Sequence, residues 1–327
     1  MTHTQAWCWH APGEPDQLTL TRQALPTPGP DEVLVANRII AFNPVDWKLI
    51  EQGHPHWQPG HVPGVDGMGV VVAVGEGVSH LRPGARVAYH ADLRRDGSFA
   101  RHTLIPARAV LSVPAGLSDE TAAAFPCPGL TAWLALAKLP EIKDEALLVA
   151  GAGSNVGRFV VALALRAGAR VFAAAGPAHH DALRCQGVCS VADYHDPAWV
   201  ERLQTANGGT PFHVVVDIAS GRQAASLVQH IDYSGHLVAV MGRVEENLWP
   251  PFSRCVSLHE VALGAQHQHG SERQWQRMVT AGEGMLQDLA QGRLPIPPVK
   301  VGEFANLPQW LSEFKRGGQG IKYLVRI

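Results

Sequence analysis

The sequence is poor in charge and has no long apolar run. Only 17% of its 327 residues are charged, against about 25% in a typical globular protein. The net charge of −2 comes without a basic cluster, so nucleic acid and anionic membrane surfaces are not expected partners. No apolar run approaches the roughly 20 residues of a membrane span. The N-terminal segment also lacks the basic, apolar and small-residue order of a signal peptide.

Cysteine is scarce as well. The five cysteines are scattered and odd in number, which favours reduced thiols in a cytoplasmic protein over a disulfide framework. The low charge instead suits buried parallel strands and an interface between subunits. A chain of 327 residues is expected to form two domains.

The N-terminal third contains short strand patterns broken by glycine and proline. These patterns cover residues 32–40, 67–78, 85–90, 98–105 and 109–114. Their lengths and turn spacing predict a small, mainly antiparallel β domain. At residue 117 the period changes, and residues 118–139 predict one helix with Ser118 as its N-cap.

Strand and helix patterns alternate in the middle of the chain. The expected strands are 146–150, 170–175, 188–192, 213–219 and 236–241, and the expected helices follow Gly157 or cover 178–186, 197–205 and 222–231. This alternation predicts an α/β fold with a doubly wound parallel sheet of the Rossmann type. Residues 260–265 are a candidate sixth strand, followed by a long helix over 271–290 and a strand–helix–strand tail.

A glycine-rich turn, Gly151-Ala-Gly-Ser-Asn-Val-Gly157, ends the first of these strands and opens a helix. Glycines let the backbone approach a pyrophosphate, and the helix N-terminus offers free N–H groups. The expected cofactor contacts are Gly151, Gly153, Ser154, Asn155, Val156 and Gly157. Gly153 lies four residues before Gly157 instead of three, so an ordinary turn of another α/β protein is the alternative. For the turn to bind, we expect Asn155 to tolerate the positive φ that glycine would allow.

Four stretches carry a resemblance to a known family. They are Asn43-Pro-Val-Asp-Trp-Lys48, residues 62–90, residues 96–133 and the glycine-rich turn. In order and spacing the chain resembles the medium-chain dehydrogenase/reductase superfamily, and within it the zinc-lacking, quinone-oxidoreductase-like branch. The resemblance implies a GroES-like domain of residues 1–122, rejoined by 266–327, and a Rossmann NADP(H)-binding domain of residues 123–265. It also implies a nicotinamide and substrate cleft between the domains, and a homodimer that pairs edge strands.

The resemblance implies no metal. Where zinc-dependent members carry Cys, His plus Glu, and a second Cys, this chain has Asn43, Val65 with Asp66, and Cys127. One thiolate and one carboxylate do not complete a three-ligand catalytic zinc site. Residues 91–99 are too few to hold a four-cysteine structural lobe. Packing in the core is the simpler role for Cys127.

The end of the second Rossmann strand favours NADP(H) over NAD(H). NAD-binding domains usually place an acid there for the ribose 2′-hydroxyl. Here Gly176 follows the strand and the next acid is Asp181, so no carboxylate repels a 2′-phosphate. His180 and Tyr194, with His179, are candidate phosphate partners, and ordinary surface side chains are the alternative.

The resemblance also assigns residues to the nicotinamide end. It places Asn43 and Thr131 at the nicotinamide ribose, and Lys322 near the cofactor from the tail. The backbone of Val240, Met241 and Gly242 and the loop 265–267 should read the carboxamide. Asp46 is expected to be a buried structural carboxylate.

A protein proton donor is not settled by the sequence, because the loop 50–61 contains no tyrosine. His54, His56, Tyr89 and His90 are the candidates, and protonation by solvent is equally consistent. Trp47, Trp57 and Trp249 would line an apolar pocket, with core packing as the alternative for each.

These patterns together predict an NADPH-dependent oxidoreductase. It would transfer a hydride to a small hydrophobic quinone or α,β-unsaturated carbonyl without a metal. One alternative is a zinc-free alcohol or aldehyde dehydrogenase. The other is a non-catalytic NADP(H)-binding redox sensor whose glycine-rich turn has drifted.

Overall fold

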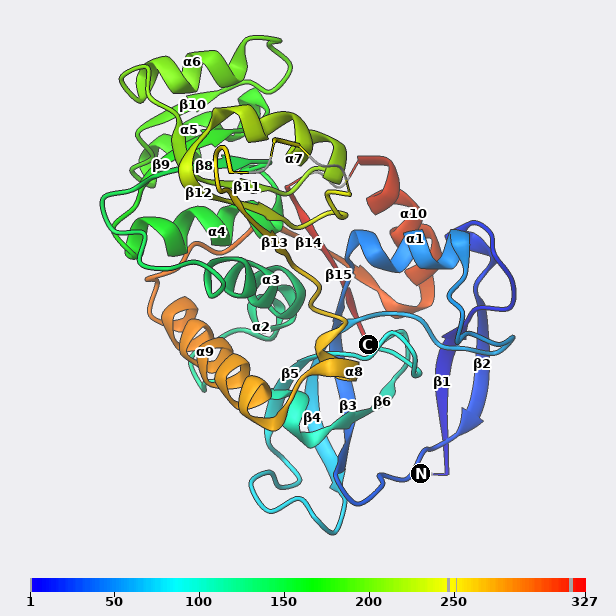
Figure 1. Ribbon diagram of the computed structural model, residues 1–327. Coiled ribbons are helices and arrows are strands. Elements are labelled where there is room, and N and C mark those ends of the chain that lie inside the picture. Colours follow the sequence, from blue (N-terminus) through cyan, green and yellow to red (C-terminus); the bar gives the residue numbers. More distant parts are fainter. Residues whose placement is uncertain (1, 246–247, 251, 318–319) are drawn as a thin grey trace. The chain divides into compact units, whose positions relative to one another are not determined.

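The computed structural model describes residues 2–245, 248–250, 252–317 and 320–327. The chain divides into two compact units, which we treat separately (Figure 1). Unit 1 comprises residues 1–127 and 264–327, and unit 2 comprises residues 128–263.

Unit 1 is built on a mainly antiparallel, seven-stranded sheet of order β14-β15-β3-β4-β5-β7, with β6 also paired to β3. Its strands are β3 (Glu32–Ala41), β4 (Asp66–Val74), β5 (Arg86–His90), β6 (His102–Pro106), β7 (Val110–Ser112), β14 (Val299–Glu303) and β15 (Lys322–Arg326). A separate hairpin consists of β1 (His3–Cys8) and β2 (Thr19–Ala24). The predicted antiparallel β domain is thus confirmed, although the sequence patterns missed the hairpin.

The C-terminal tail completes this sheet. Strand β15 pairs antiparallel with β3, and β14 pairs parallel with β15 after the connecting helix α10 (Leu307–Gly317). Aromatic packing joins the same segments, since the ring of Phe42 contacts those of Phe99 and Phe314. The predicted strand–helix–strand tail is confirmed, and it places Lys322 beside strands from the first hundred residues.

The other helices of unit 1 correct one prediction. They are α1 (Pro44–Gln52), α2 (Asp119–Ala124), α8 (Gln266–His269) and α9 (Glu272–Ala290). Ser118 caps α2 as expected, by accepting the Thr121 N–H at 3.1 Å. The single helix predicted over 118–139 is two, because α3 (Pro126–Leu136) begins anew at Pro126. A proline has no N–H and disfavours helical backbone at the preceding residue, so the helix breaks there.

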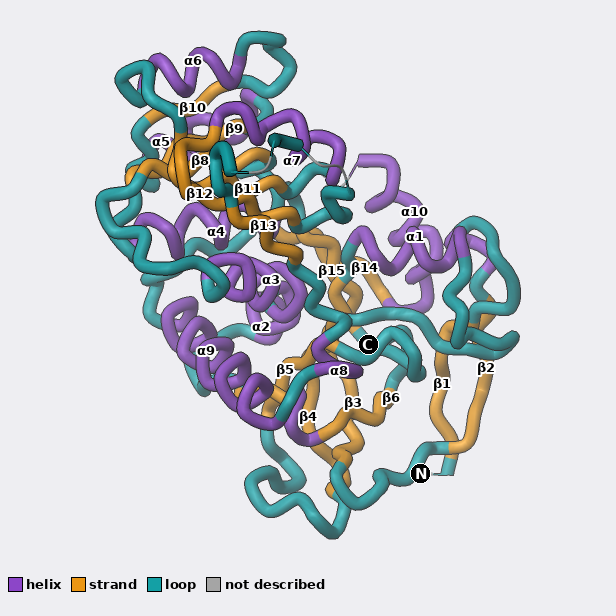
Figure 2. Tube along the Cα trace, viewed as in Figure 1, coloured by secondary structure: helices purple, strands orange, loops and turns teal. Residues whose placement is uncertain are grey.

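Unit 2 contains a six-stranded parallel sheet of order β10-β9-β8-β11-β12-β13 (Figure 2). The strands are β8 (Ala146–Ala150), β9 (Arg170–Ala174), β10 (Ser190–Ala192), β11 (Phe212–Asp217), β12 (Ile231–Ala239) and β13 (Ser257–Glu260). The helices α4 (Asn155–Arg166), α5 (His180–Cys185), α6 (Trp199–Ala206) and α7 (Gly221–Leu227) connect them. In chain order this is the 3-2-1-4-5-6 arrangement of the Rossmann fold, so the predicted doubly wound sheet is confirmed.

The predicted sixth strand is displaced along the sequence. It covers Ser257–Glu260, not 260–265. The strand lies at the edge of the sheet and is largely exposed, whereas Val261 and Leu263 are buried after it. The apolar pattern therefore marked buried loop residues and not the hydrogen-bonded strand.

Candidate functional site

The glycine-rich turn of unit 2 is held at both ends. Gly151 has a φ of +89°, a conformation that favours glycine. The N–H groups of Gly151 and Ala152 donate to the Ala174 carbonyl at 3.1 and 3.0 Å, which ties the turn to the end of β9. Ser154 caps α4 by accepting the Gly157 N–H at 3.0 Å, and its hydroxyl donates to the Gly151 carbonyl at 2.8 Å. Ser154 thus supplies the cap of this helix.

The expectation of positive φ at Asn155 is wrong. Asn155 is the first residue of α4, and the left-handed conformation falls on Gly151 instead. At the start of a helix the N–H groups of Asn155 and Val156 have no intrahelical acceptor, so they suit an anion. Among the described residues, the buried Asn155 Oδ1 has no hydrogen-bond partner. The free N–H groups at the start of α4, not this amide oxygen, fit the bound phosphates of a dinucleotide.

The loop after β9 contains His179, which lies beside the guanidinium of Arg158, and leads to His180 at the start of α5. The Arg158 Nη2 lies 3.2 Å from the His179 Nδ1, and its Nε donates to the Gly153 carbonyl at 3.4 Å. A Cβ on Gly153 would lie 2.2 Å from the His179 ring, so glycine makes room for that imidazole. His180 turns back, with its Nε2 2.9 Å from the Ala175 carbonyl. Arg158 did not stand out in the sequence, because only the fold brings it to this loop.

The remaining cofactor candidates of unit 2 occupy separate places. Thr131 is buried on α3. Tyr194 is exposed, with its ring 4.1 Å from that of His195. The Val240 N–H donates to the Asp217 carbonyl at 2.9 Å, Met241 follows, and Gly242 has a φ of +98°.

Sequence reasoning missed Asp217, the last residue of β11. Its side chain is buried, and one oxygen accepts the Ser220 N–H at 3.0 Å, while the other has no hydrogen-bond partner in the part of the chain that the structure describes. Burial raises the pKa of Asp217 to about 6. A carboxylate at the carboxyl end of a central parallel strand is placed where such sheets bind ligands.

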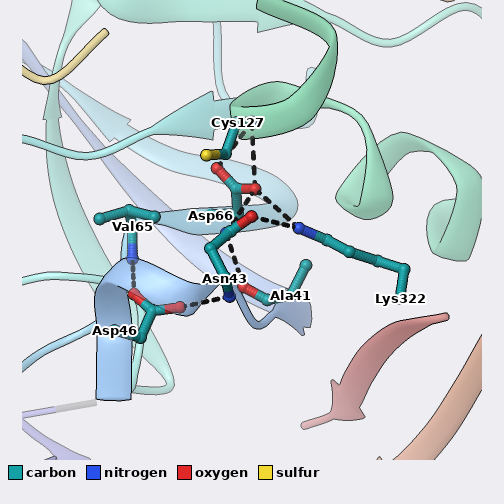
Figure 3. A network of polar contacts seen from close by, with 7 residues as sticks. All are labelled: Ala41, Asn43, Asp46, Val65, Asp66, Cys127 and Lys322. Carbon is teal, nitrogen blue, oxygen red and sulfur yellow. Dashed lines mark hydrogen bonds and ion pairs between the residues drawn. The ribbon is translucent and has the colours of Figure 1, made fainter. Parts of the chain in front are cut away.

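A buried polar network occupies unit 1, made of Asn43, Asp46, Asp66, Cys127 and Lys322 (Figure 3). Asn43 is the N-cap of α1, and Asp46 in the first turn accepts the Asn43 N–H at 2.6 Å. The other oxygen of Asp46 accepts the Val65 N–H at 3.1 Å. The local sequence Asn-Pro-Val-Asp therefore starts a helix and buries one carboxylate.

Asp66 and Lys322 form the centre of this network. Both side chains are fully buried, and the Lys322 Nζ lies 2.6 Å from the Asn43 Oδ1 and 3.3 Å from the Asp66 Oδ2. Asp66 also accepts the Asn43 Nδ2 at 2.8 Å and the Cys127 N–H at 3.0 and 3.1 Å. Figure 3 shows the lysine reaching toward these two side chains from β15. Asn43 is held at both ends of its amide, which fixes its orientation.

The network holds two carboxylates against one ammonium. Burial raises the pKa of Asp46 to about 7, with the neighbouring Asp66 charge acting in the same direction. Burial also raises the pKa of Asp66, while Lys322 and the hydrogen bonds from Asn43 and Cys127 oppose that rise. Asp46 therefore takes up a proton near neutral pH.

Asp46→Asn is expected to flatten the pH dependence of stability. A carboxyl group whose pKa is raised on folding stabilises the native state fully below its unfolded pKa of 3.8, and this contribution is lost as the pH rises toward about 7. Asparagine does not titrate. Relative to the wild type, the free energy of unfolding of the variant should thus increase by about 2 kcal/mol between about pH 5 and pH 8. Urea denaturation at each pH measures this, and parallel pH profiles would contradict it.

The positions that hold zinc ligands in zinc-dependent members of the family have a different role in this chain. Lys322 contacts Asn43 and Asp66, so the ammonium is the cation that these two side chains surround. In the described part of the chain, no group of three or more His, Cys, Asp or Glu side chains is arranged to hold a metal ion. Cys127 is half-buried and lies next to Asp66.

The candidate proton donors differ in burial and in charge. Tyr89 is fully buried, donates to the Asn37 Oδ1 at 2.7 Å, and burial raises the pKa of its hydroxyl far above neutral pH. Burial, aided by Lys322, lowers the pKa of His90 to about 4, so this imidazole is neutral at pH 7. The His90 Nδ1 has no hydrogen-bond partner among the residues described, and the His90 ring stacks on that of His267. His56 is exposed beside His54.

The three predicted pocket tryptophans differ in their surroundings. Trp57 is a core residue, because its Nε1 donates to the Leu93 carbonyl at 2.7 Å and its ring stacks on His61. Trp47 is half-buried with the ammonium groups of Lys48 and Lys315 over its ring. Trp249 packs, partly buried, against the core of unit 2. Trp57 therefore takes the core position that the sequence left as its alternative.

Comparisons with known proteins agree with this architecture. Residues 29–115 match the alcohol dehydrogenase GroES-like domain. The chain is 33% identical over 214 residues to the trans-enoyl reductase tazE of Aspergillus terreus, covering 60% of this chain and 70% of the relative. The chain belongs to the medium-chain dehydrogenase/reductase superfamily.

Other relatives of this medium-chain oxidoreductase differ in length and name. Quinone oxidoreductase 1 of Escherichia coli is 33% identical over 215 residues, which are 64% of each chain. A phthioceranic/hydroxyphthioceranic acid synthase of Mycobacterium tuberculosis is 30% identical over 263 residues, 77% of this chain but only 12% of the synthase. The fold matches an alcohol dehydrogenase superfamily protein of Novosphingobium aromaticivorans with a TM-score of 0.88 at 23% identity, over 99% of both chains. Among the described residues, no helix of this chain is long and apolar enough to cross a membrane.

Proposed function

We propose that the protein is an NADPH-dependent reductase of quinones or α,β-unsaturated carbonyls that works without a metal. The observation that carries the proposal is the Ser154-capped glycine-rich turn, next to a second strand that ends without a carboxylate. The similarity to a quinone oxidoreductase and a trans-enoyl reductase supports this choice of acceptor.

When bound, NADPH would supply the hydride, and the chain would supply position and electrostatics. The turn residues Gly151 to Gly157 would bind the pyrophosphate through the free N–H groups of α4. We assign Gly176, His180 and Tyr194 to the adenosine ribose side. Thr131, Val240, Met241, Gly242, Asn43 and Lys322 are assigned to the nicotinamide side.

Because the described residues include no cluster that could hold a metal ion, Lys322 has the electrostatic role in this proposal. Its buried ammonium fixes the Asn43 amide at 2.6 Å and offsets the charge of Asp66. A fixed positive charge in a dry site favours negative charge that develops on an acceptor oxygen. Because Lys322 is fully buried, it acts through Asn43 and the field, not by touching the acceptor.

Proton delivery favours acceptors that need no protein acid. A hydride added to a quinone carbonyl system gives a hydroquinone anion, which water can protonate. Reduction of an enone adds hydride to the β-carbon and a proton to the α-carbon. Tyr89 is sealed in the core and His90 is neutral at pH 7, so solvent is the proton source that we propose for either acceptor.

A steady-state screen of NADPH oxidation tests this function. We expect turnover with 1,4-quinones, 2-alkenals or enones, and none with simple alcohols plus NADP⁺. Turnover should be unchanged by a chelator, because no step needs a metal. Binding of NADPH without turnover of any acceptor would indicate a sensor instead, and chelator-sensitive alcohol oxidation would indicate a dehydrogenase.

We also propose that the reductase forms a homodimer. Strand β13 is an edge of the parallel sheet, with Leu258 exposed on it and Tyr233 exposed on the adjacent β12. Such an edge is stabilised when another strand pairs with it. Light scattering at the mass of one chain would contradict a dimer.

A further inference from the structure

Arg158 is a cation that has no carboxylate partner among the described residues. It is half-buried in the first turn of α4. Its hydrogen-bond partners among the described residues are the Gly153 carbonyl and the His179 Nδ1, and neither carries a negative charge. Burial lowers the pKa of the guanidinium, which nevertheless stays charged at any physiological pH. Partial desolvation of an unpaired guanidinium costs free energy, and a bound anion would recover it.

His179 completes a pair of donors. A guanidinium only donates hydrogen bonds, so the His179 Nδ1 must accept, and the ring proton must lie on Nε2. Burial and the neighbouring Arg158 charge lower the pKa of His179, in agreement with a neutral ring. The imidazole lies against Gly153, where any larger residue would displace it. Its Nε2–H and the guanidinium therefore form one donor surface.

The location separates this pair from the pyrophosphate position. The free N–H groups that suit a pyrophosphate belong to Asn155 and Val156, at the start of α4. Arg158 instead reaches across to His179, in the loop that follows β9. In a Rossmann fold the adenosine ribose lies at the end of this second strand, and an arginine there accommodates a 2′-phosphate.

We infer that Arg158 and His179 form the subsite for the 2′-phosphate of NADP(H) and set the preference over NAD(H). The inference rests on the proposed function and names residues for it. A guanidinium fork matches the geometry of a phosphate with two parallel N–H donors. Two acids near this loop have other partners, since Asp193 contacts His195 at 2.7 Å and Asp181 accepts from Arg184 at 2.9 Å.

Arg158→Gln tests the inference by direct binding. Dissociation constants for NADPH and NADH are measured by fluorescence titration on the full chain. We expect the NADPH constant to rise at least tenfold and the NADH constant to stay within twofold. Arg158→Lys, which keeps the charge but not the fork, should retain part of the preference. Arg184→Gln is the matched control, because this exposed arginine of α5 pairs only with Asp181 in the described structure, and both constants should stay at their wild-type values.

Each other outcome has a defined meaning. Equal weakening of both nucleotides by Arg158→Gln would assign the side chain to the pyrophosphate and overturn the inference. Unchanged constants for both would overturn it as well, while the proposed function stands. Wild-type protein that binds neither nucleotide would overturn the proposed function together with the inference.

Discussion

Lys322→Met is expected to lower the free energy of unfolding by about 3–5 kcal/mol. The substitution removes the ammonium that contacts Asp66 and Asn43, and leaves a fully buried carboxylate with no counter-charge. The Asn43 amide oxygen loses its donor at the same time. Because burial already raises the pKa of Asp66, the variant should bind a proton there, and its stability should fall further as the pH rises. Urea denaturation at two pH values measures both effects.

Two further variants make this result specific. Asp66→Asn combined with Lys322→Met removes both charges, so the double variant should be more stable than Lys322→Met alone. Lys300→Met is the matched control, since this lysine of β14 pairs with Glu313 at the surface and should cost no more than about 1 kcal/mol. If Lys322→Met and Lys300→Met cost the same, the buried network does not stabilise the fold.

Gly157→Ala is expected to destroy most of the nucleotide affinity. A Cβ at Gly157 would lie 2.3 Å from the Gly151 carbonyl oxygen and 2.7 Å from the Ala152 Cα. Both atoms are backbone, so α4 must move away from the turn and the helix N-terminus leaves the phosphate position. We expect the dissociation constant for NADPH to rise at least tenfold, or about 1.4 kcal/mol, together with a loss of thermal stability.

Gly284→Ala provides the comparison, because it is the same substitution in another helix. Gly284 is exposed on α9, and a Cβ there would meet no atom within 4 Å. Alanine is favoured over glycine in a helix interior by about 1 kcal/mol, so this variant should be slightly more stable with unchanged NADPH binding. If the two variants behave alike, close packing at Gly157 is not what shapes the turn.

Much of the fold could be predicted because its signals are local. The apolar strand 146–150, the glycines of the turn and the cap at Ser118 each depend on neighbours within a few residues. The predictions that failed were based on local sequence patterns that fit more than one structure. Asn155 was expected in a left-handed conformation, but Ser154 starts the helix before it. The apolar run after residue 260 is buried without being a strand.

The candidate site was predicted less completely, because hydrogen bonding and burial decide what a side chain can do. Tyr89 and His90 were reasonable proton donors by type, yet burial holds one on Asn37 and keeps the other neutral at pH 7. Trp57 is of a residue type that often lines pockets, yet it is a core residue. Arg158 and Asp217 carried no sequence signal, since their importance comes from the loop and strand end that they reach.

The sequence by itself determined the two kinds of sheet, the glycine-rich turn and the family resemblance, because strand periodicity, glycine and helix caps act over short distances. Only the tertiary structure decided the charge arrangement. Lys322 meets Asn43 and Asp66 although 279 and 256 residues separate them along the chain. The physical reason is that β15 returns to pair with β3, and a buried ammonium is stable only where folding brings a carboxylate within reach.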